Sequence, residues 1–134
     1  MTDDRIVTEA DVVTKVSRQP VPDTVAKLTA MIAAKGMRLF AVIDQAAEAR
    51  QAGLTLRETT LVLFGSPAAG TPVMAAAPLS ALDLPLKVLV WADGGQTKVS
   101  YYAPAALAAS HHLTADLAAN LSGISALTDA LVAS

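Results

Sequence analysis

Two ionisable residues stand in apolar surroundings where their charge could serve chemistry. Asp44 follows the apolar run 37–43, and a carboxylate at a strand end could act as a base or hold a ligand. Asp is also a residue type that caps a following helix, and capping is the favoured interpretation. Lys87 lies within the apolar run 86–91, so its ammonium group must reach water or a carboxylate such as Asp83. In a cleft it would bind an anion or take part in catalysis, whereas at a strand end it would only extend into water.

A glycine-containing segment offers a second kind of site. Gly65, Ser66, Gly70 and Thr71 precede an expected helix, whose first N–H groups can bind an anion, and the two hydroxyl groups add further donors. The same residues also suit a turn and a helix cap without any ligand. No lysine follows at the spacing of a phosphate-binding loop, so the structural interpretation is favoured over ligand binding.

The other residues that could bind a metal or a base have simpler structural interpretations. His111 and His112 are adjacent, which points them to different sides of a helix, and no third ligand stands at a recognisable spacing. The chain has no cysteine, which excludes disulfides, thiolate zinc sites and iron–sulfur clusters. Trp91, Tyr101 and Tyr102 are interpreted as sheet packing rather than as a stacking platform for bases. We therefore expect no metal and no cofactor.

The composition indicates a cytoplasmic protein of one domain. The 134 residues suffice for one domain, and the 53% hydrophobic content supplies a core. A net charge of −2 without a run of Lys or Arg argues against nucleic-acid binding. The uncharged segment 59–82 is interrupted by prolines and glycines, so we do not expect it to cross a membrane. The acidic start of the chain also lacks the apolar stretch of a secretory signal.

Apolar periodicity, together with helix and turn signals, predicts the elements that carry these residues. The expected strands, of which the second is predicted to be buried, cover residues 11–17, 37–43, 59–64, 86–91 and 97–102. The expected helices cover residues 22–35, 45–51, 72–77 and 104–110, followed by one final helix from about residue 114. Asp44 and Thr71 are expected to cap the second and third of these helices. A turn at 93–95 joins the last two strands as a hairpin, because glycine tolerates the positive φ of such turns.

Residues 10–134 are therefore predicted to form a single α+β domain, preceded by a flexible N-terminus at residues 1–9. The predicted order of elements is β-α-β-α-β-α-β-β-α. The hairpin favours a mainly antiparallel sheet with the helices packed on one face, rather than a doubly wound parallel fold. The long helix after the first strand and the C-terminal helix are the candidates to cover that face.

Several segments, taken as a set, resemble the domain of unknown function 302 family. They run in family order over roughly residues 10–133 and comprise Val42-Ile43-Asp44, Ala52-Gly53-Leu54, Leu63-Phe64-Gly65-Ser66-Pro67, Gly70-Thr71-Pro72-Val73-Met74, Asp83-Leu84-Pro85-Leu86-Lys87 and Tyr102-Ala103-Pro104. The resemblance implies a compact α+β domain that pairs as a homodimer, and it brings no reaction and no accepted cofactor. Two positions depart from the family pattern, since Gln45 stands where His is common and Ser66 where Asn is common. If the family uses that His for proton transfer or metal binding, Gln45 cannot replace it, because an amide does not titrate.

Three functions remain open from the sequence. The favoured hypothesis is a non-catalytic module that acts as a homodimer and binds a partner protein or a small polar or anionic ligand, held between Asp44, the Ser66–Thr71 loop and Lys87. Its candidate ligand-binding residues are Asp44, Gln45, Gly65, Ser66, Gly70, Thr71 and Lys87. The second hypothesis is an enzyme of unrecognised class, with Lys87 as electrophile or nucleophile and Asp44 as acid or base. The third is a purely structural dimerisation domain.

Overall fold

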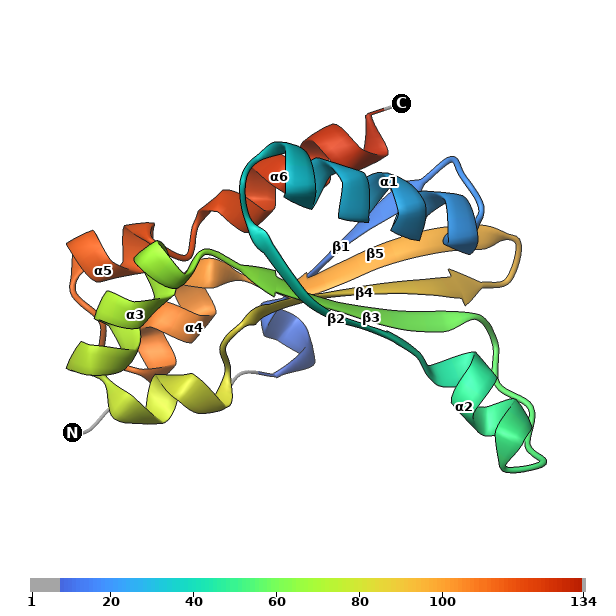
Figure 1. Cartoon of the computed structure of the whole chain (residues 1–134), viewed down its shortest axis with the longest axis horizontal. Helices are drawn as coiled ribbons and strands as arrows, with labels where there is room; N and C mark the ends of the chain where they lie inside the picture. Colours follow the sequence, from blue (N-terminus) through green and yellow to red (C-terminus); the bar gives the residue numbers. More distant parts are fainter. Residues whose placement is uncertain (1–7, 134) are drawn as a thin grey trace.

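An antiparallel sheet of five strands, in the order β1-β5-β4-β3-β2, forms the centre of the computed structural model, which describes residues 8–133 (Figure 1). The strands are β1 (Val12–Ser17), β2 (Arg38–Asp44), β3 (Thr59–Gly65), β4 (Leu86–Asp93) and β5 (Gln96–Tyr102). The α-helices are α1 (Val21–Ala34), α2 (Gln45–Gln51), α3 (Pro67–Ala76), α4 (Pro104–Ser110), α5 (Ala115–Ala119) and α6 (Gly123–Val132). Two short 3₁₀ helices are η1 (Glu9–Asp11) and η2 (Pro78–Leu82).

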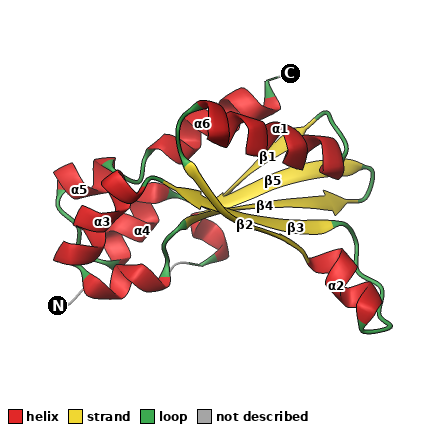
Figure 2. Ribbon diagram, in the orientation of Figure 1, coloured by secondary structure: helices red, strands yellow, loops and turns green. Residues whose placement is uncertain are grey.

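Helices α1 and α6 lie together on one face of the sheet (Figure 2). Their apolar residues recur at helical spacing, which gives each helix one apolar side. The main core joins these sides to alternate strand residues and contains Leu28, Ile32, Val62, Phe64, Val88, Val90, Val99, Ile124, Leu127 and Leu131, each no more than 2% exposed. Because side chains alternate along a strand, the residues between these positions must point to the opposite face.

That opposite face, which we call the uncovered face, is mainly apolar at its centre. The strand register places its side chains in three rows across the sheet, which are Ala41–Leu63–Lys87, Ile43–Leu61–Leu89–Ser100–Thr14 and Thr59–Trp91–Lys98–Val16. Val12 and Tyr102 are paired partners that extend the first row toward β1. Among residues 8–133, the helices that pack along the sheet lie on the other face, and Figure 1 shows α2 and η2 at opposite ends below the strands.

A second group of helices gathers at the end of the sheet where β3 ends and β4 begins (Figure 1). It contains α3, η2, α4 and α5, and it has a core of its own built from Val73, Leu107 and Leu121. Leu86 packs against both this core and the main one, so the end cluster is continuous with the rest of the domain.

Much of the expected secondary structure is confirmed. The five strands, α1, α2 and α4 appear at or within a few residues of their expected bounds. The hairpin turn is formed by Gly94, at φ 61°, and Gly95. The α+β fold with a mainly antiparallel sheet is therefore correct.

The second strand was expected to be buried, and this is wrong. β2 is an edge strand, and Leu39, Phe40 and Val42 are 42–48% exposed. An apolar run of this length is typical of a buried strand, but one side of an edge strand has no neighbour to cover it. The register also shifts between Leu39 and Ala41, so that Phe40 is an extra residue in a β-bulge.

Two expected helix boundaries are also wrong. The third helix begins at Pro67 rather than after Thr71, because the Ser66 hydroxyl already accepts a hydrogen bond from the N–H of Ala69 at 3.3 Å. Ser66–Pro67 is a cap followed by a first-turn proline, and the similar pair Thr71–Pro72 lies inside the helix. The single final helix is divided into α5 and α6 by the turn at residues 120–122.

The expected flexible segment 1–9 lies mostly outside the described residues. Thr8 and Glu9 are described, and the N–H of Thr8 donates to Asp11 Oδ2 at 3.1 Å, which ties the start of η1 to its end. Within residues 8–133, α1 is the longest helix with 14 residues, and no helix has the length and apolar character needed to cross a membrane.

Candidate functional site

A cavity of about 120 Å³ lies where the end of β3 meets the starts of α3, β4 and α6. Its wall includes Met37, Phe40, Phe64, Met74 and Leu86. Three of the candidate residues, Gly65, Ser66 and Gly70, also line it, because the helix start that carries them forms one side of the opening. Thr71 is exposed on α3 and does not line the cavity.

Asp44 and Gln45 lie at the other end of β2. Asp44 is paired with Thr60, whereas Gly65 is paired with Arg38, so about 17 Å of strand β3 separates the two ends. Asp44 caps α2, since its Oδ1 accepts a hydrogen bond from the N–H of Ala47 at 2.9 Å. The expected capping role of Asp44 is thus confirmed.

Lys87 lies on the uncovered face, opposite Leu63 of β3. Its ammonium group donates to the carbonyl oxygens of Asp83, at 3.0 Å, and Pro85, at 3.2 Å. Asp44 shares the face of Thr60 and Val62, which is the helix-covered one, so Lys87 and Asp44 point to opposite sides of the sheet. The seven candidate residues therefore do not surround one pocket, and their role in ligand binding stays a prediction.

His111 has a specific partner, unlike His112. His111 Nε2 lies 2.6 Å from Asp83 Oδ2, which joins the end of α4 to the segment before β4. His112 is exposed and has a positive φ of 53°. Within residues 8–133, no group of three His, Asp or Glu residues is arranged to hold a metal ion.

Polar groups on the uncovered face are satisfied by one another. Trp91 Nε1 donates to Ser100 Oγ at 3.0 Å, and Ser100 Oγ lies 2.9 Å from Thr14 Oγ1. Lys98 Nζ donates to Asp93 Oδ2 at 2.6 Å and also lies 5.5 Å from the centre of the Trp91 ring. The hydrogen bond from Lys98 lowers the pKa of Asp93 below its ordinary value.

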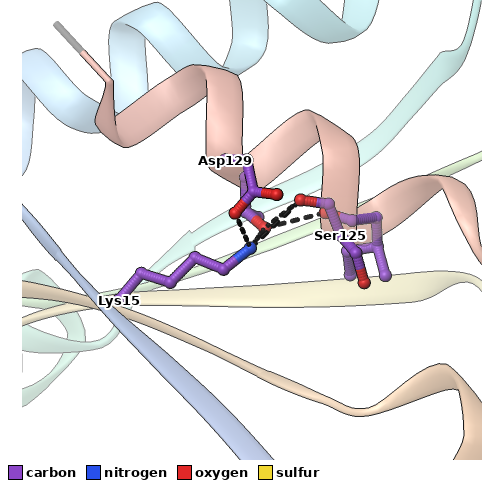
Figure 3. Close-up of polar contacts among 5 residues, drawn as sticks. Lys15, Ser125 and Asp129 are labelled. Carbon is purple, nitrogen blue, oxygen red and sulfur yellow. Dashed lines mark hydrogen bonds and ion pairs between the residues drawn. The ribbon is translucent and has the colours of Figure 1, made fainter.

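A polar cluster that the sequence did not indicate lies between the sheet and α6 (Figure 3). Lys15 Nζ is 2.7 Å from Asp129 Oδ1, 2.7 Å from Thr128 Oγ1 and 3.0 Å from the carbonyl oxygen of Ser125. It also lies 5.1 Å from the centre of the Tyr101 ring. Only 18% of the Lys15 side chain is exposed, so the ammonium group is held largely by these partners.

Lys15 and Tyr101 each contribute to the pKa shift of the other. Burial lowers the pKa of Lys15, but its contacts with Asp129 and Tyr101 outweigh burial and raise this pKa above the ordinary value. Burial likewise raises the pKa of Tyr101, but the hydrogen bond with Lys15 and those with Ser125 and Thr128 lower it overall. Lys15 does not line the cavity at the end of β3, and the shift in its pKa follows from burial and from its contacts with Asp129 and Tyr101.

The sequence shows a lysine within the first expected strand, but only the strand register shows that it lies on the core side. Lys15 shares its side of β1 with Val13 and Ser17, and such a position requires a polar partner for the ammonium group. The partner itself could not be identified, since Thr128 is 113 residues away along the chain.

Comparison with solved structures supports the fold. The chain is similar to a crystal structure of an uncharacterized conserved protein DUF302 from Bacillus stearothermophilus, with a TM-score of 0.77. The similarity covers 91% of this chain and 95% of that one. At 17% sequence identity, this likeness concerns the fold alone.

Comparison with curated proteins finds relatives that are much longer than this chain. Over 108 residues, the chain is 37% identical to proteins named fluoride-specific ion channel FluC 1 in Brucella suis biovar 1 and FluC 2 in Brucella melitensis biotype 1. The matched segment covers 80% of this chain, but only 42% and 40% of those two relatives. The chain therefore spans about two-fifths of the curated relatives that it matches.

The family comparison agrees with the structural one. The model of the family described as domain of unknown function DUF302 matches residues 13–131, from the first strand to the last helix. The resemblance in the short segments around Asp44, Ser66 and Lys87 is thus part of a match along nearly the whole fold, and the chain belongs to the DUF302 family.

Proposed function

We propose that this domain is a non-catalytic binding module that works as a homodimer, with the uncovered faces of two copies packed against each other. The observation that carries the proposal is the apolar centre of this face. Leu61, Leu63, Leu89 and Trp91 are half-buried there, while core residues on the opposite face of the same strands, such as Val62 and Val88, are fully buried. A second copy would bury these side chains in the way that paired sheets bury their inner faces.

The size of the face suits a stable dimer. Five strands spaced by ~4.8 Å, each with about six residues at ~3.4 Å, give a footprint of roughly 24 by 20 Å. Side-chain relief increases the accessible area above that flat value, toward the ~800 Å² per partner of a standard interface. A twofold dimer uses the same patch on both copies, so each copy brings a complete face.

The polar residues of the face also tolerate burial. Trp91, Ser100 and Thr14 are hydrogen-bonded to one another, and Lys98 is paired with Asp93. Lys87 donates to two carbonyl oxygens of its own chain. A second copy can therefore cover the face without leaving these groups unpaired, which would otherwise cost about 1–3 kcal/mol for each group.

Sedimentation equilibrium over a range of protein concentrations tests the dimer. We expect wild type to reach twice the chain mass of 13.7 kDa, and Leu89→Glu and Val16→Glu to remain monomeric. Val16 is 49% exposed, so its variant should fold even if Leu89→Glu does not. Ala26→Glu is the control, because Ala26 is exposed on α1, on the helix-covered side of the sheet. A wild-type monomer at all concentrations would refute the proposal, as would dimerisation of a folded Val16→Glu variant equal to wild type.

The enzyme hypothesis has less support in this geometry. It required Lys87 and Asp44 in one active site, and these side chains lie on opposite faces of the sheet. The ammonium group of Lys87 is also occupied by the carbonyl oxygens of Asp83 and Pro85.

The curated relatives favour a second candidate function, which is an accessory role beside a fluoride channel. Proteins named as such channels carry a segment 37% identical to this chain within a longer sequence. Units joined in one chain in some organisms often act together as separate chains in others. Co-sedimentation with vesicles that contain a purified fluoride-specific channel tests this role, with empty vesicles as the control. Equal recovery of the protein on both kinds of vesicle would count against it.

A further inference from the structure

We propose that the cavity at the end of β3 binds a small, uncharged molecule through an apolar group about the size of one aromatic ring. This inference concerns a different site from the proposed dimer face and does not depend on dimer formation. The cavity opens between the starts of α3 and α6, whereas the dimer face lies on the other side of the sheet.

The lining of the cavity favours an apolar ligand. Among the described residues, Ser66 and Asn120 contribute the only polar side chains, and no ionisable side chain lines it. A charged or strongly polar group would lose its hydration here and find few partners, which is costly. Apolar contacts would come from Phe64, Leu84 and Leu86.

The two polar side chains already have partners within the wall. Ser66 Oγ accepts from the N–H of Ala69, and Asn120 Nδ2 donates to the carbonyl oxygen of Ala69 at 3.1 Å. Asn120 thus joins the turn before α6 to α3, one on each side of the opening. The cavity is therefore a built feature of the fold rather than a gap between unconnected helices.

The β-bulge in β2 is an independent sign that this site is used. Leu39 is paired with Phe64 and Ala41 with Leu63, so Phe40 is the inserted residue. Without this insertion, the residue after Leu39 would be paired with Leu63 and would point to the uncovered face. Phe40 would then not line the opening. Bulges often change the direction of a side chain next to a functional site. Phe40 is 48% exposed, and the Arg38 guanidinium lies 5.4 Å from its ring centre.

The size and the flexible walls define the class of ligand. A volume of about 120 Å³ is close to that of engineered apolar cavities, roughly 150 Å³, that bind benzene. Met37 and Met74 lie on the wall, and methionine side chains adapt their shape to apolar guests and contact aromatic rings favourably. A compact aromatic or branched aliphatic group fits both features.

Methionine-methyl NMR with benzene as the probe tests the proposal directly. We expect the methyl signals of Met37 and Met74 to shift saturably as benzene is added. Met31 packs against the main core and does not line the cavity, so its signal serves as the internal reference. Pyrimidine has the same shape but loses the hydrogen bonds of its two nitrogens to water, and the wall offers at most the Ser66 hydroxyl and the Asn120 amide in return, so we expect it to bind at least about tenfold more weakly.

Two substitutions on α3 form a matched pair. Gly70→Leu adds a side chain whose Cβ would lie 3.9 Å from Met74 Cε, so it should fill the cavity and weaken benzene binding by about tenfold or more. Thr71→Leu adds the same side chain at the next, exposed position and should leave binding within about twofold of wild type. Phe40→Ala, at the exposed rim, should also weaken binding and is not expected to prevent folding.

Four results would overturn the proposal. They are the absence of a saturable shift at Met37 and Met74, an equal shift at Met31, equal loss of binding in Gly70→Leu and Thr71→Leu, and binding of pyrimidine as tight as that of benzene. Sedimentation tests the dimer separately. If the cavity does not bind benzene, the proposed homodimer is unaffected, and if the protein is a monomer, the proposed cavity site is unaffected.

Discussion

Lys15 joins the first strand to the last helix through a carboxylate, a hydroxyl group and a carbonyl oxygen. All three partners lie on α6, within residues 125–129. Replacement by methionine keeps the aliphatic part of the side chain but leaves these groups without their donor. We expect Lys15→Met to lower the free energy of unfolding by about 1–3 kcal/mol, the usual cost of losing hydrogen bonds to a charged group.

Chemical denaturation measures this loss, and Lys35→Met is the control. Lys35 is exposed beyond the end of α1, so its replacement should change stability by less than about 0.5 kcal/mol. Equal stability of the two variants would mean that water replaces the partners of Lys15 at no cost.

The pair formed by Asp93 and Lys98 predicts a pH effect. The pKa of Asp93 is lower in the folded protein than its ordinary value of 3.8, so the unfolded chain takes up the proton more readily. The stabilisation from this pair is therefore complete above the ordinary pKa of 3.8. It is lost as the pH falls through the lower pKa that Asp93 has in the folded protein. We expect Asp93→Asn to flatten the decline of stability with acid below about pH 4, measured by urea denaturation at several pH values. A slope identical to that of wild type would contradict this assignment.

At the scale of elements, the sequence predicted those features that short spacings determine. The cap at Asp44, the helix at 104–110 and the glycine turn of the hairpin each depend on neighbours within a few residues. The errors occurred where two local signals competed or where tertiary position decided. Ser66–Pro67 and Thr71–Pro72 carry the same capping signal, and in the structure Ser66 is the cap while Pro72 lies inside α3. The exposure of β2 depends on its place at the sheet edge, which periodicity does not encode.

The cap at Asp44 allows a test that separates structure from chemistry. We expect Asp44→Ala to lower stability by about 1 kcal/mol and Asp44→Asn to retain most of it, because an Asn side chain also caps a helix. Glu48→Ala, within the same helix, is the control. Thermal unfolding measures all three variants. If Asp44→Asn were as unstable as Asp44→Ala, the carboxylate charge rather than the cap would be the important feature.

At the scale of the whole molecule, the candidate site could be predicted only in part from the sequence. Gly65, Ser66 and Gly70 do line a cavity, but the sequence could not show that Asp44 would lie at the other end of its strand or that Lys87 would face the opposite side. Both facts follow from the strand order and the antiparallel register of β2, β3 and β4, in which Asp44 is paired with Thr60 and Lys87 with Leu63. That order depends on contacts between distant segments, which local propensity does not specify.

The pairing of β1 with β5 has a consequence for the chain as it leaves the ribosome. The partner of β1 is Gln96–Tyr102, and the helix that holds Lys15 starts at Gly123. Synthesis proceeds at about 5–20 residues per second, so the first strand waits several seconds for its neighbours. During that interval its valines are exposed to any other unpaired strand. A ribosome that stops before Gly123 would release a chain whose first strand still lacks the helix that covers Val13 and Lys15, and such a product should be a preferred substrate of chaperones and proteases.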